Sequence, residues 1–136
     1  MMHRWPIRVY YEDTDLAGIV YYANYLRFIE RARSELVRAA GIDQLAMKAA
    51  GMVFVVRRVE ADYLSPARFD DQLEVRSQLQ QLKAASLTLS QEVWRHDTLI
   101  FRAVVALAVV NAEGRATRLP AAIRASLAVF TADVSR

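Results

Sequence analysis

The sequence has no cysteine, few glycines and prolines, and no long apolar run. Without cysteine, the chain cannot hold a disulfide framework, a thiolate metal site, an iron–sulfur cluster or a cysteine nucleophile. Four glycines and three prolines exclude a collagen-like repeat. The longest apolar run covers residues 103–110, whereas a transmembrane helix needs about 18 apolar residues. We therefore expect no membrane span. Because residues 1–6 lack the apolar segment of a secretory signal, we also expect a cytoplasmic location.

The composition of the 136 residues is typical of a folded domain, with 54% hydrophobic and 24% charged residues. Intrinsic disorder needs low hydrophobicity and high net charge. This chain is long enough to bury a core, so we expect a single domain over residues 1–136. The net charge is +3, and basic residues alternate with acidic ones, as along residues 27–38. This pattern predicts a mildly basic surface and no nucleic-acid partner.

Several motifs of well-known enzyme classes are missing. The sequence has no G-x-G-x-x-G, no Walker loop and no G-x-S-x-G, so nucleotide binding by those folds and a serine hydrolase are not supported. The two histidines are isolated, His3 near a terminus that we expect to fray and His96 in a predicted turn. Both are expected to be surface residues rather than catalysts.

One amphipathic helix is predicted over residues 22–40. Apolar residues recur there at steps of three and four, with Leu26 and Ala32 on the inward stripe. Asn24 is a candidate N-cap, although a start nearer Tyr21 fits equally well. Gly41 predicts the end of the helix, because glycine adopts the left-handed cap conformation without steric cost.

The remaining elements are mostly strands. Residues 7–11 alternate as a first strand, a turn is expected at 82–85, and Pro66 should interrupt strand pairing. The later strands are predicted over residues 52–64, 73–80, 87–93 and 99–110, with a short last one at 115–119. Two short helices are predicted, one capped by Asp43 and ending at Gly51, the other over residues 120–130.

This order predicts an α+β fold in which one long helix packs on an antiparallel sheet. Consecutive strands joined by short turns form an antiparallel meander, and the helix and sheet bury each other's apolar faces. A single layer leaves the sheet edges open, so we expect two subunits to pair edge to edge.

The loop before the long helix is the strongest candidate for chemistry. Glu12, Asp13 and Asp15 lie there, followed by Gly18. The first N–H groups of a helix are unpaired and its dipole is positive there, so this end can stabilise an oxyanion. Acyl-transfer hydrolysis needs a nucleophile or general base and a group that polarises the carbonyl. A carboxylate beside this helix end would supply the first, and the helix N–H groups the second. A simpler interpretation also fits, in which the acids only cap the helix and solvate the turn.

Other functions for these residues are weaker. The acidic cluster offers oxygen ligands to Ca²⁺ or Mg²⁺ but lacks the remaining ligands of a calcium loop, so no metal is expected. The tyrosines around the loop are expected to pack in the core or at an interface. Arg57, Arg58 and Lys83 could meet phosphates, although a solvated edge is their simplest role.

The segment YYEDTDLAGIVYYANYLRFIERAR (residues 10–33) resembles the hotdog-fold acyl-CoA thioesterases of the 4-hydroxybenzoyl-CoA thioesterase type. Within these it is most similar to the bacterial branch associated with the Tol-Pal system. FVVR (54–57) and YLSPARFDD (63–71) resemble the same branch, and the resemblance extends from Ile7 to Phe130.

The resemblance implies a hotdog fold, in which an antiparallel sheet wraps the long helix, and homodimers that assemble as homotetramers. It implies hydrolysis of acyl-CoA to free acid and CoA without a cofactor. By resemblance, Asp15 is the catalytic carboxylate, the backbone N–H of Tyr22 polarises the thioester carbonyl, and Gly18 permits the protein backbone to approach the substrate closely. Glu12 and Asp13 are expected to face away or to orient the loop.

The chain departs from this branch at Tyr22, where many members carry histidine. The backbone N–H survives the exchange, but a phenol with an ordinary pKa near 10 is a poor base at neutral pH. Three alternatives therefore stay open: Glu30 on the helix as the catalytic acid, an acyl carrier protein as the acyl donor, and a non-catalytic protein that binds acyl-CoA or acyl carrier protein.

Overall fold

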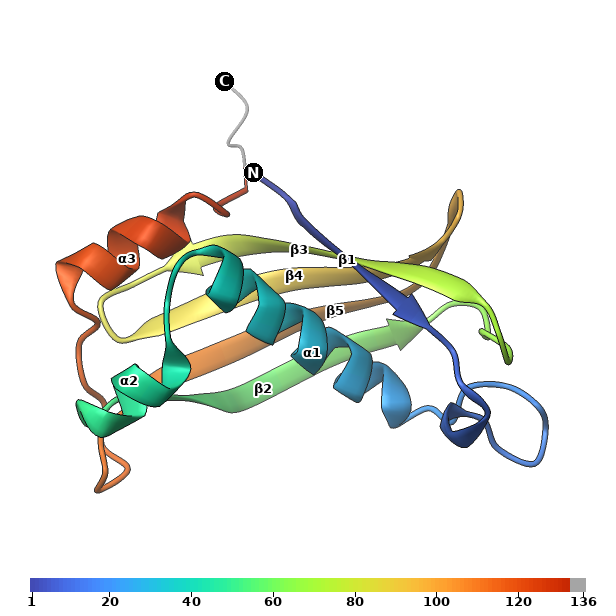
Figure 1. The fold of residues 1–136 in the computed structure, drawn as a ribbon, viewed down its shortest axis with the longest axis horizontal. Helices are drawn as coiled ribbons and strands as arrows, with labels where there is room; N and C mark the ends of the chain where they lie inside the picture. Colours follow the sequence, from blue (N-terminus) through green and yellow to red (C-terminus); the bar gives the residue numbers. More distant parts are fainter. Residues whose placement is uncertain (133–136) are drawn as a thin grey trace.

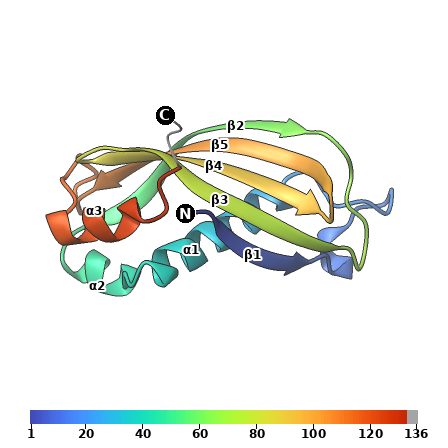
Figure 2. The ribbon, with the colours of Figure 1, turned by 90° about the horizontal axis from the view of Figure 1, so that it is seen from above.

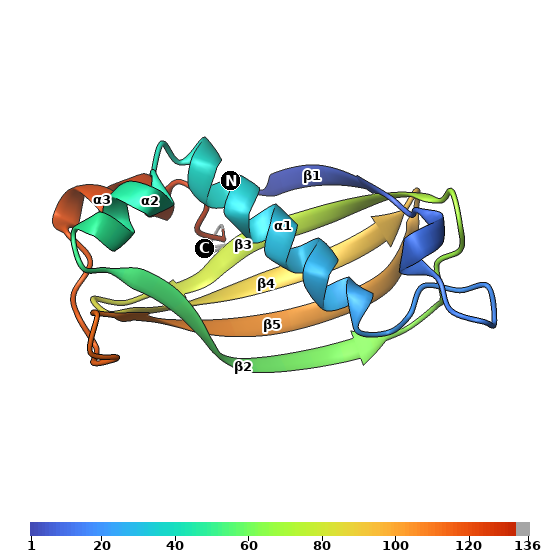
Figure 3. The same cartoon turned by 60° about the horizontal axis from the view of Figure 1, so that its bottom comes forward.

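The computed structural model describes residues 1–132 and shows a curved antiparallel sheet with a long helix across one face (Figures 1 and 3). The strands are β1 (His3–Arg8), β2 (Val53–Tyr63), β3 (Gln72–Leu82), β4 (Ser86–Arg95) and β5 (Thr98–Val110). The helices are α1 (Asn24–Ala39), α2 (Gln44–Ala49) and α3 (Ala121–Ala128), with a 3₁₀ turn at Tyr11–Asp13. The predicted α+β class is therefore confirmed.

The strand order is β1-β3-β4-β5-β2. β3, β4 and β5 form the predicted antiparallel meander, but β2 pairs with β5 rather than with its successor β3. The prediction of one continuous meander is wrong at this point. The connection over residues 64–71 carries the chain from the β2 edge across the sheet to β3 (Figure 2). This path leaves one side of β2 without a neighbouring strand among the described residues.

Helix α1 buries an apolar stripe against the concave face of the sheet. Phe28, Ile29, Ala32 and Leu36 have almost no exposed surface. The small side chain of Ala32 lets the helix backbone come close to the strands. Leu26 was expected on this stripe, but its side chain is 39% exposed. Tyr25, one residue earlier, occupies the inward position instead, since consecutive helical residues lie about 100° apart.

The predicted C-terminal end of α1 is confirmed, whereas the predicted N-cap is wrong. Gly41 has φ +81°, which confirms that it ends the helix in the left-handed conformation. Asp43 caps α2, as predicted, by accepting hydrogen bonds from the N–H groups of Leu45 and Ala46. Asn24 is not an N-cap: it is the first residue of α1, and its side-chain amide donates to the carbonyl of Asp13.

Four predictions for residues 1–11 and 115–120 are wrong. The first strand spans His3–Arg8 rather than residues 7–11. His3 is therefore not frayed; it is half-buried, with its ring stacked on Trp5 and edge-on to Phe130. No strand forms at residues 115–119, where only Ala116 makes an isolated bridge. Pro120 precedes α3 as its N-cap instead of being the first helical residue.

A buried polar cluster connects α1 to the centre of the sheet. Gln91 on β4 has no exposed surface. Its Nε2 donates to the carbonyl of Ile29 and to the hydroxyl of Ser77, both at 2.9 Å, and its Oε1 accepts from Arg33 at 2.9 Å. Burial lowers the pKa of the Arg33 guanidinium, and the charge of Glu30 partly opposes this. Because buried polar groups cost free energy when unpaired, this cluster fixes the helix at one position over the sheet.

Replacement of Gln91 should therefore destabilise the fold. In Gln91→Ala, Ser77 and Arg33 lose their buried partner, and we expect a loss of about 3 kcal/mol in the free energy of unfolding. Urea denaturation followed by circular dichroism measures this. Gln80→Ala, at an exposed position on β3, should stay within about 0.5 kcal/mol of the parent protein. Equal losses in the two variants would contradict the role of the cluster.

Candidate active site

The acidic loop is held in place by Asp13, which is buried. Its Oδ2 accepts a hydrogen bond from the N–H of Tyr10 at 2.8 Å. Its carbonyl oxygen accepts from the N–H of Tyr21 and from the side-chain amide of Asn24, both at 2.9 Å. Asp13 therefore orients the loop, as expected, and joins it to the start of α1. Its neighbour Glu12 is exposed.

Asp15 lies in a tight turn with its carboxylate exposed. Its Oδ1 accepts from the N–H of Ala17, its N–H donates to the carbonyl of Ile19, and its carbonyl accepts from the N–H of Gly18, each at 2.9 Å. Gly18 has φ +80°, a conformation that other residues rarely adopt. The turn thus requires glycine at position 18 and leaves the second carboxylate oxygen of Asp15 available.

The start of α1 presents backbone N–H groups without acceptors. Within residues 1–132, the N–H groups of Tyr22 and Ala23 donate no hydrogen bond, whereas the N–H of Asn24 donates to the carbonyl of Tyr21 at 2.8 Å. The Tyr22 side chain is 62% exposed. Such N–H groups at the positive end of a helix dipole can bind an anion or a developing oxyanion.

An apolar pocket of about 290 Å³ lies beside these N–H groups. It is formed by the loop before α1, the first turn of α1, the end of β2 and the segment that follows β2. Its lining consists of Ile19, Val20, Tyr22, Tyr25, Tyr63, Leu64, Ser65 and Pro66. Pockets of this kind, with an apolar lining and a few polar groups, are typical ligand sites.

The tyrosines give the pocket a rigid wall. Tyr25 is stacked on Phe101 with ring centroids 5.0 Å apart, and Tyr63 packs edge-on against both rings. The hydroxyl of Tyr25 accepts a hydrogen bond from the N–H of Ala67 at 3.0 Å. Burial raises the pKa of the Tyr25 phenol, and burial also raises that of Tyr63. The sequence predicts only a packing role for Tyr25 and does not mark Tyr63 as a site residue, although both lie in the quoted motifs.

Asp15, Gly18 and Tyr22 lie in the loop before α1; of these three residues Tyr22 lines the pocket, whereas Asp15 and Gly18 do not. Glu30 lies about two turns along α1, on an exposed face near Arg33. Within residues 1–132, no group of three or more potential ligands could hold a metal ion. No helix of the described chain is long and apolar enough to cross a membrane.

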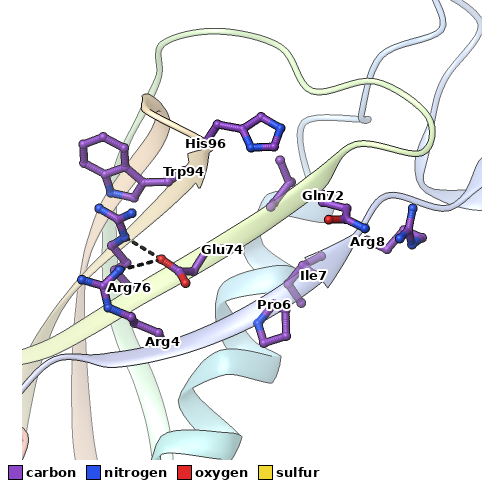
Figure 4. A pocket seen from close by; sticks show the side chains of 10 residues that line it. Arg4, Pro6, Ile7, Arg8, Gln72, Glu74, Arg76, Trp94 and His96 are labelled. Atoms are coloured by element: carbon purple, nitrogen blue, oxygen red, sulfur yellow. Dashed lines mark hydrogen bonds and ion pairs between the residues drawn. The ribbon is translucent and has the colours of Figure 1, made fainter.

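A larger hollow of about 650 Å³ lies on the opposite face of the sheet, over β1, β3 and β4 (Figure 4). Glu74 accepts hydrogen bonds there from Arg4 at 2.9 Å and from Arg76 at 2.8 Å. These bonds, that of Arg76 foremost, hold the pKa of Glu74 below its ordinary value. Arg76 also lies over the Trp94 ring, 4.4 Å from its centroid. The charges in this hollow therefore already have partners within the protein.

Comparison with known proteins points to one family. The profile of the thioesterase-like superfamily matches residues 9–127. The chain is 41% identical over 111 residues to the acyl-CoA thioester hydrolase YbgC of Escherichia coli O6:H1. The matched region covers 81% of this chain and 83% of the relative. It is 38% identical over 108 residues to the acyl-CoA thioesterase YbgC of Haemophilus influenzae, with 79% of each chain covered.

Solved structures give the same result. The crystal structure of a probable thioesterase from Bartonella henselae superposes with a TM-score of 0.83 and 35% identity, over 88% of this chain and all of that one. A protein from Thermus thermophilus superposes with a TM-score of 0.88 and 29% identity, over 94% of this chain and 98% of that one.

The buried phenol of Tyr25 should make stability depend on pH in the alkaline range. Its pKa is higher in the folded chain than the ordinary value of 10.0, so the folded state holds this proton more tightly than the unfolded state. The contribution is fully present below about pH 10 and is lost as pH rises through the folded pKa. Urea denaturation between about pH 8 and pH 11 should show this loss.

The decrease in the free energy of unfolding with rising pH should be shallower in Tyr25→Phe. That variant should also be about 1–2 kcal/mol less stable at neutral pH, because the buried N–H of Ala67 loses its acceptor. Tyr11→Phe, at a side chain that is 82% exposed, serves as the control. An unchanged alkaline slope in Tyr25→Phe would contradict the assignment.

Proposed function

The chain belongs to the thioesterase-like superfamily and has the hotdog fold, and we propose that it hydrolyses acyl-CoA thioesters to a free acid and CoA. The observation that carries this proposal is the segment from Asp15 to Ala23. There, a tight turn holds a carboxylate a few residues before two N–H groups that lack acceptors. The YbgC relatives, which are named as acyl-CoA thioester hydrolases, support the same activity.

In the proposed mechanism, the thioester carbonyl oxygen lies against the N–H of Tyr22. As the carbonyl carbon becomes tetrahedral, negative charge develops on this oxygen. The free N–H and the positive end of the α1 dipole stabilise that charge. This role uses only the backbone of Tyr22, so tyrosine is as suitable as histidine at this position. The Tyr22 ring contributes to the pocket wall.

Asp15 acts either as the nucleophile or as the general base. Its carboxylate either attacks the carbonyl carbon directly, giving a mixed anhydride that water hydrolyses, or takes a proton from a water that attacks. In both routes the C–S bond breaks and CoA leaves as the thiolate. If water opens the mixed anhydride at the carboxyl carbon of Asp15, a single turnover in heavy-oxygen water puts the solvent oxygen into Asp15 and leaves the released acid unlabelled, which identifies direct attack. The turn at Gly18 keeps the carboxylate free for this step, and the route needs no cofactor.

We further propose that the free edge of β2 pairs with β2 of a second copy, and that such dimers assemble as tetramers. β2 is eleven residues long and is exposed along most of its length. Val55, Val56 and Val59 are all more than a third exposed. A long exposed edge strand has unpaired N–H and C=O groups and is a template for pairing with another chain, and pairing would place the end of β2, with Tyr63, at the boundary between protomers.

Finer assignments follow from the sequence motifs. We propose that the chain belongs to the 4-hydroxybenzoyl-CoA thioesterase type and to its Tol-Pal-associated branch. We also propose that it works in the cytoplasm. Acyl carrier protein is proposed as an alternative acyl donor. The absence of a nucleic-acid partner stays a prediction from the alternating charges. Assays with acyl-CoA and acyl carrier protein thioesters side by side test the donor.

Asp15→Asn should lower kcat by roughly 10²–10⁴-fold, because the amide can neither attack nor take a proton. The fold should be unchanged, since the amide oxygen can still accept from the N–H of Ala17. A thiol-reactive dye measures turnover without background, because the chain has no cysteine. Glu30→Gln should retain near-normal activity. Activity lost in Glu30→Gln and kept in Asp15→Asn would reverse the assignment, and a parent protein that binds acyl-CoA without hydrolysis would identify a non-catalytic binder.

Val59→Lys should weaken the pairing of β2 edges, because a charged residue on an edge strand opposes association. Light scattering should show a shift of the molar mass toward the 15.4 kDa of one chain. Val129→Lys, which replaces another exposed valine just after α3, is the control and should leave the mass unchanged. The same mass in both variants would count against the β2 interface.

A further inference from the structure

We propose that Tyr63 is a positioning residue that orients the peptide between Tyr22 and Ala23 at the oxyanion site. This inference rests on the proposed thioesterase function. Tyr63 is the last residue of β2, 41 positions from Tyr22 in the sequence, and its hydroxyl donates a hydrogen bond to the carbonyl oxygen of Tyr22 at 3.1 Å. The bond therefore connects the free edge strand of the sheet to the start of α1.

The carbonyl of Tyr22 depends on this bond because the helix does not supply a donor. In a regular α-helix, the carbonyl of residue 22 would accept from the N–H of residue 26. Here the N–H of Leu26 donates to the carbonyl of Ala23 instead, at 3.2 Å. Within residues 1–132, the hydroxyl of Tyr63 is thus the donor recorded for the carbonyl of Tyr22.

The direction of the hydroxyl is set by packing rather than by solvent. The Tyr63 ring makes edge-on contacts with Tyr25, Phe101 and Tyr22, at centroid distances of 5.5, 5.0 and 6.1 Å. Tyr25 and Phe101 are buried, so they offer a fixed surface. Tyr63 is itself 48% exposed, and the three ring contacts hold its ring beside the start of the helix.

The bond acts on the N–H groups of Ala23 and Tyr22 at the start of α1. The carbonyl of Tyr22 and the N–H of Ala23 belong to one rigid peptide plane, so holding the oxygen fixes the direction of that N–H. It also restrains the adjoining peptide that carries the N–H of Tyr22, whose own carbonyl side is held by the bond from Asn24 to Tyr21. A donor on the carbonyl further polarises the peptide and strengthens its N–H. Both effects favour the transition state, where the oxyanion is fully formed.

The variant Tyr63→Phe tests this role, because it removes the hydroxyl and keeps the ring. We expect kcat to fall about five- to tenfold, as for the loss of one hydrogen bond, with KM within about twofold of the parent value. The reduction should be the same for acetyl-CoA and for benzoyl-CoA, since the oxyanion is common to every thioester. The melting temperature should stay close to that of the matched control Tyr11→Phe.

The remaining outcomes distinguish an error about Tyr63 from an error about the proposed function. A kcat equal to that of Tyr11→Phe in an active parent protein would overturn the role of Tyr63 and leave the proposed function intact. A higher KM that depends on the acyl group would also overturn it, because Tyr63 would then act only as pocket wall. A lower melting temperature with a proportional loss of active protein, and unchanged kcat per folded molecule, would reduce Tyr63 to a structural residue. A parent protein inactive on both thioesters would overturn the proposed function and this inference together.

Discussion

The candidate site depends on the two hydrogen bonds that the carbonyl oxygen of Asp13 accepts from the start of α1. One comes from the backbone of Tyr21 and the other from the side chain of Asn24. They join the acidic loop to the helix, so that the turn of Asp15 and the free N–H groups of Tyr22 and Ala23 belong to one locally rigid unit. Because the proposed catalysis requires fixed geometry, the buried Asp13 supports the role proposed for the exposed Asp15.

This unit is held in turn by the rest of the fold. Helix α1 lies across the concave face of the sheet (Figure 3) and buries its apolar side chains there. Gln91 fixes the position of the helix by donating a hydrogen bond to the carbonyl of Ile29. At the start of the helix, Tyr25 and Tyr63 reach segments from other parts of the chain, the N–H of Ala67 and the carbonyl of Tyr22. The hydroxyl groups of these two tyrosines thus connect the start of α1 to other parts of the chain.

Sequence patterns predicted the elements better than their arrangement. The periods of apolar residues located α1 and the long strands, and Gly41 and Asp43 marked helix ends correctly. The same patterns misplaced β2, because alternation shows which face of a strand is buried but not which strand lies beside it. They also misplaced Leu26, because the apolar residues of the helix fit more than one rotation of the helix about its axis. Packing on the sheet decides which rotation occurs.

For the site, the sequence by itself determined the local chemistry: a carboxylate, a glycine turn and a helix start within a few residues of one another. These features are close in the chain, so short-range geometry fixes them whatever the rest of the fold does. Only the tertiary structure decided that Tyr63 reaches the carbonyl of Tyr22, that Tyr25 closes the pocket against Ala67, and that Glu30 lies apart. Contacts between residues about 40 positions apart depend on the order of strands in the sheet, which no local pattern of side chains encodes.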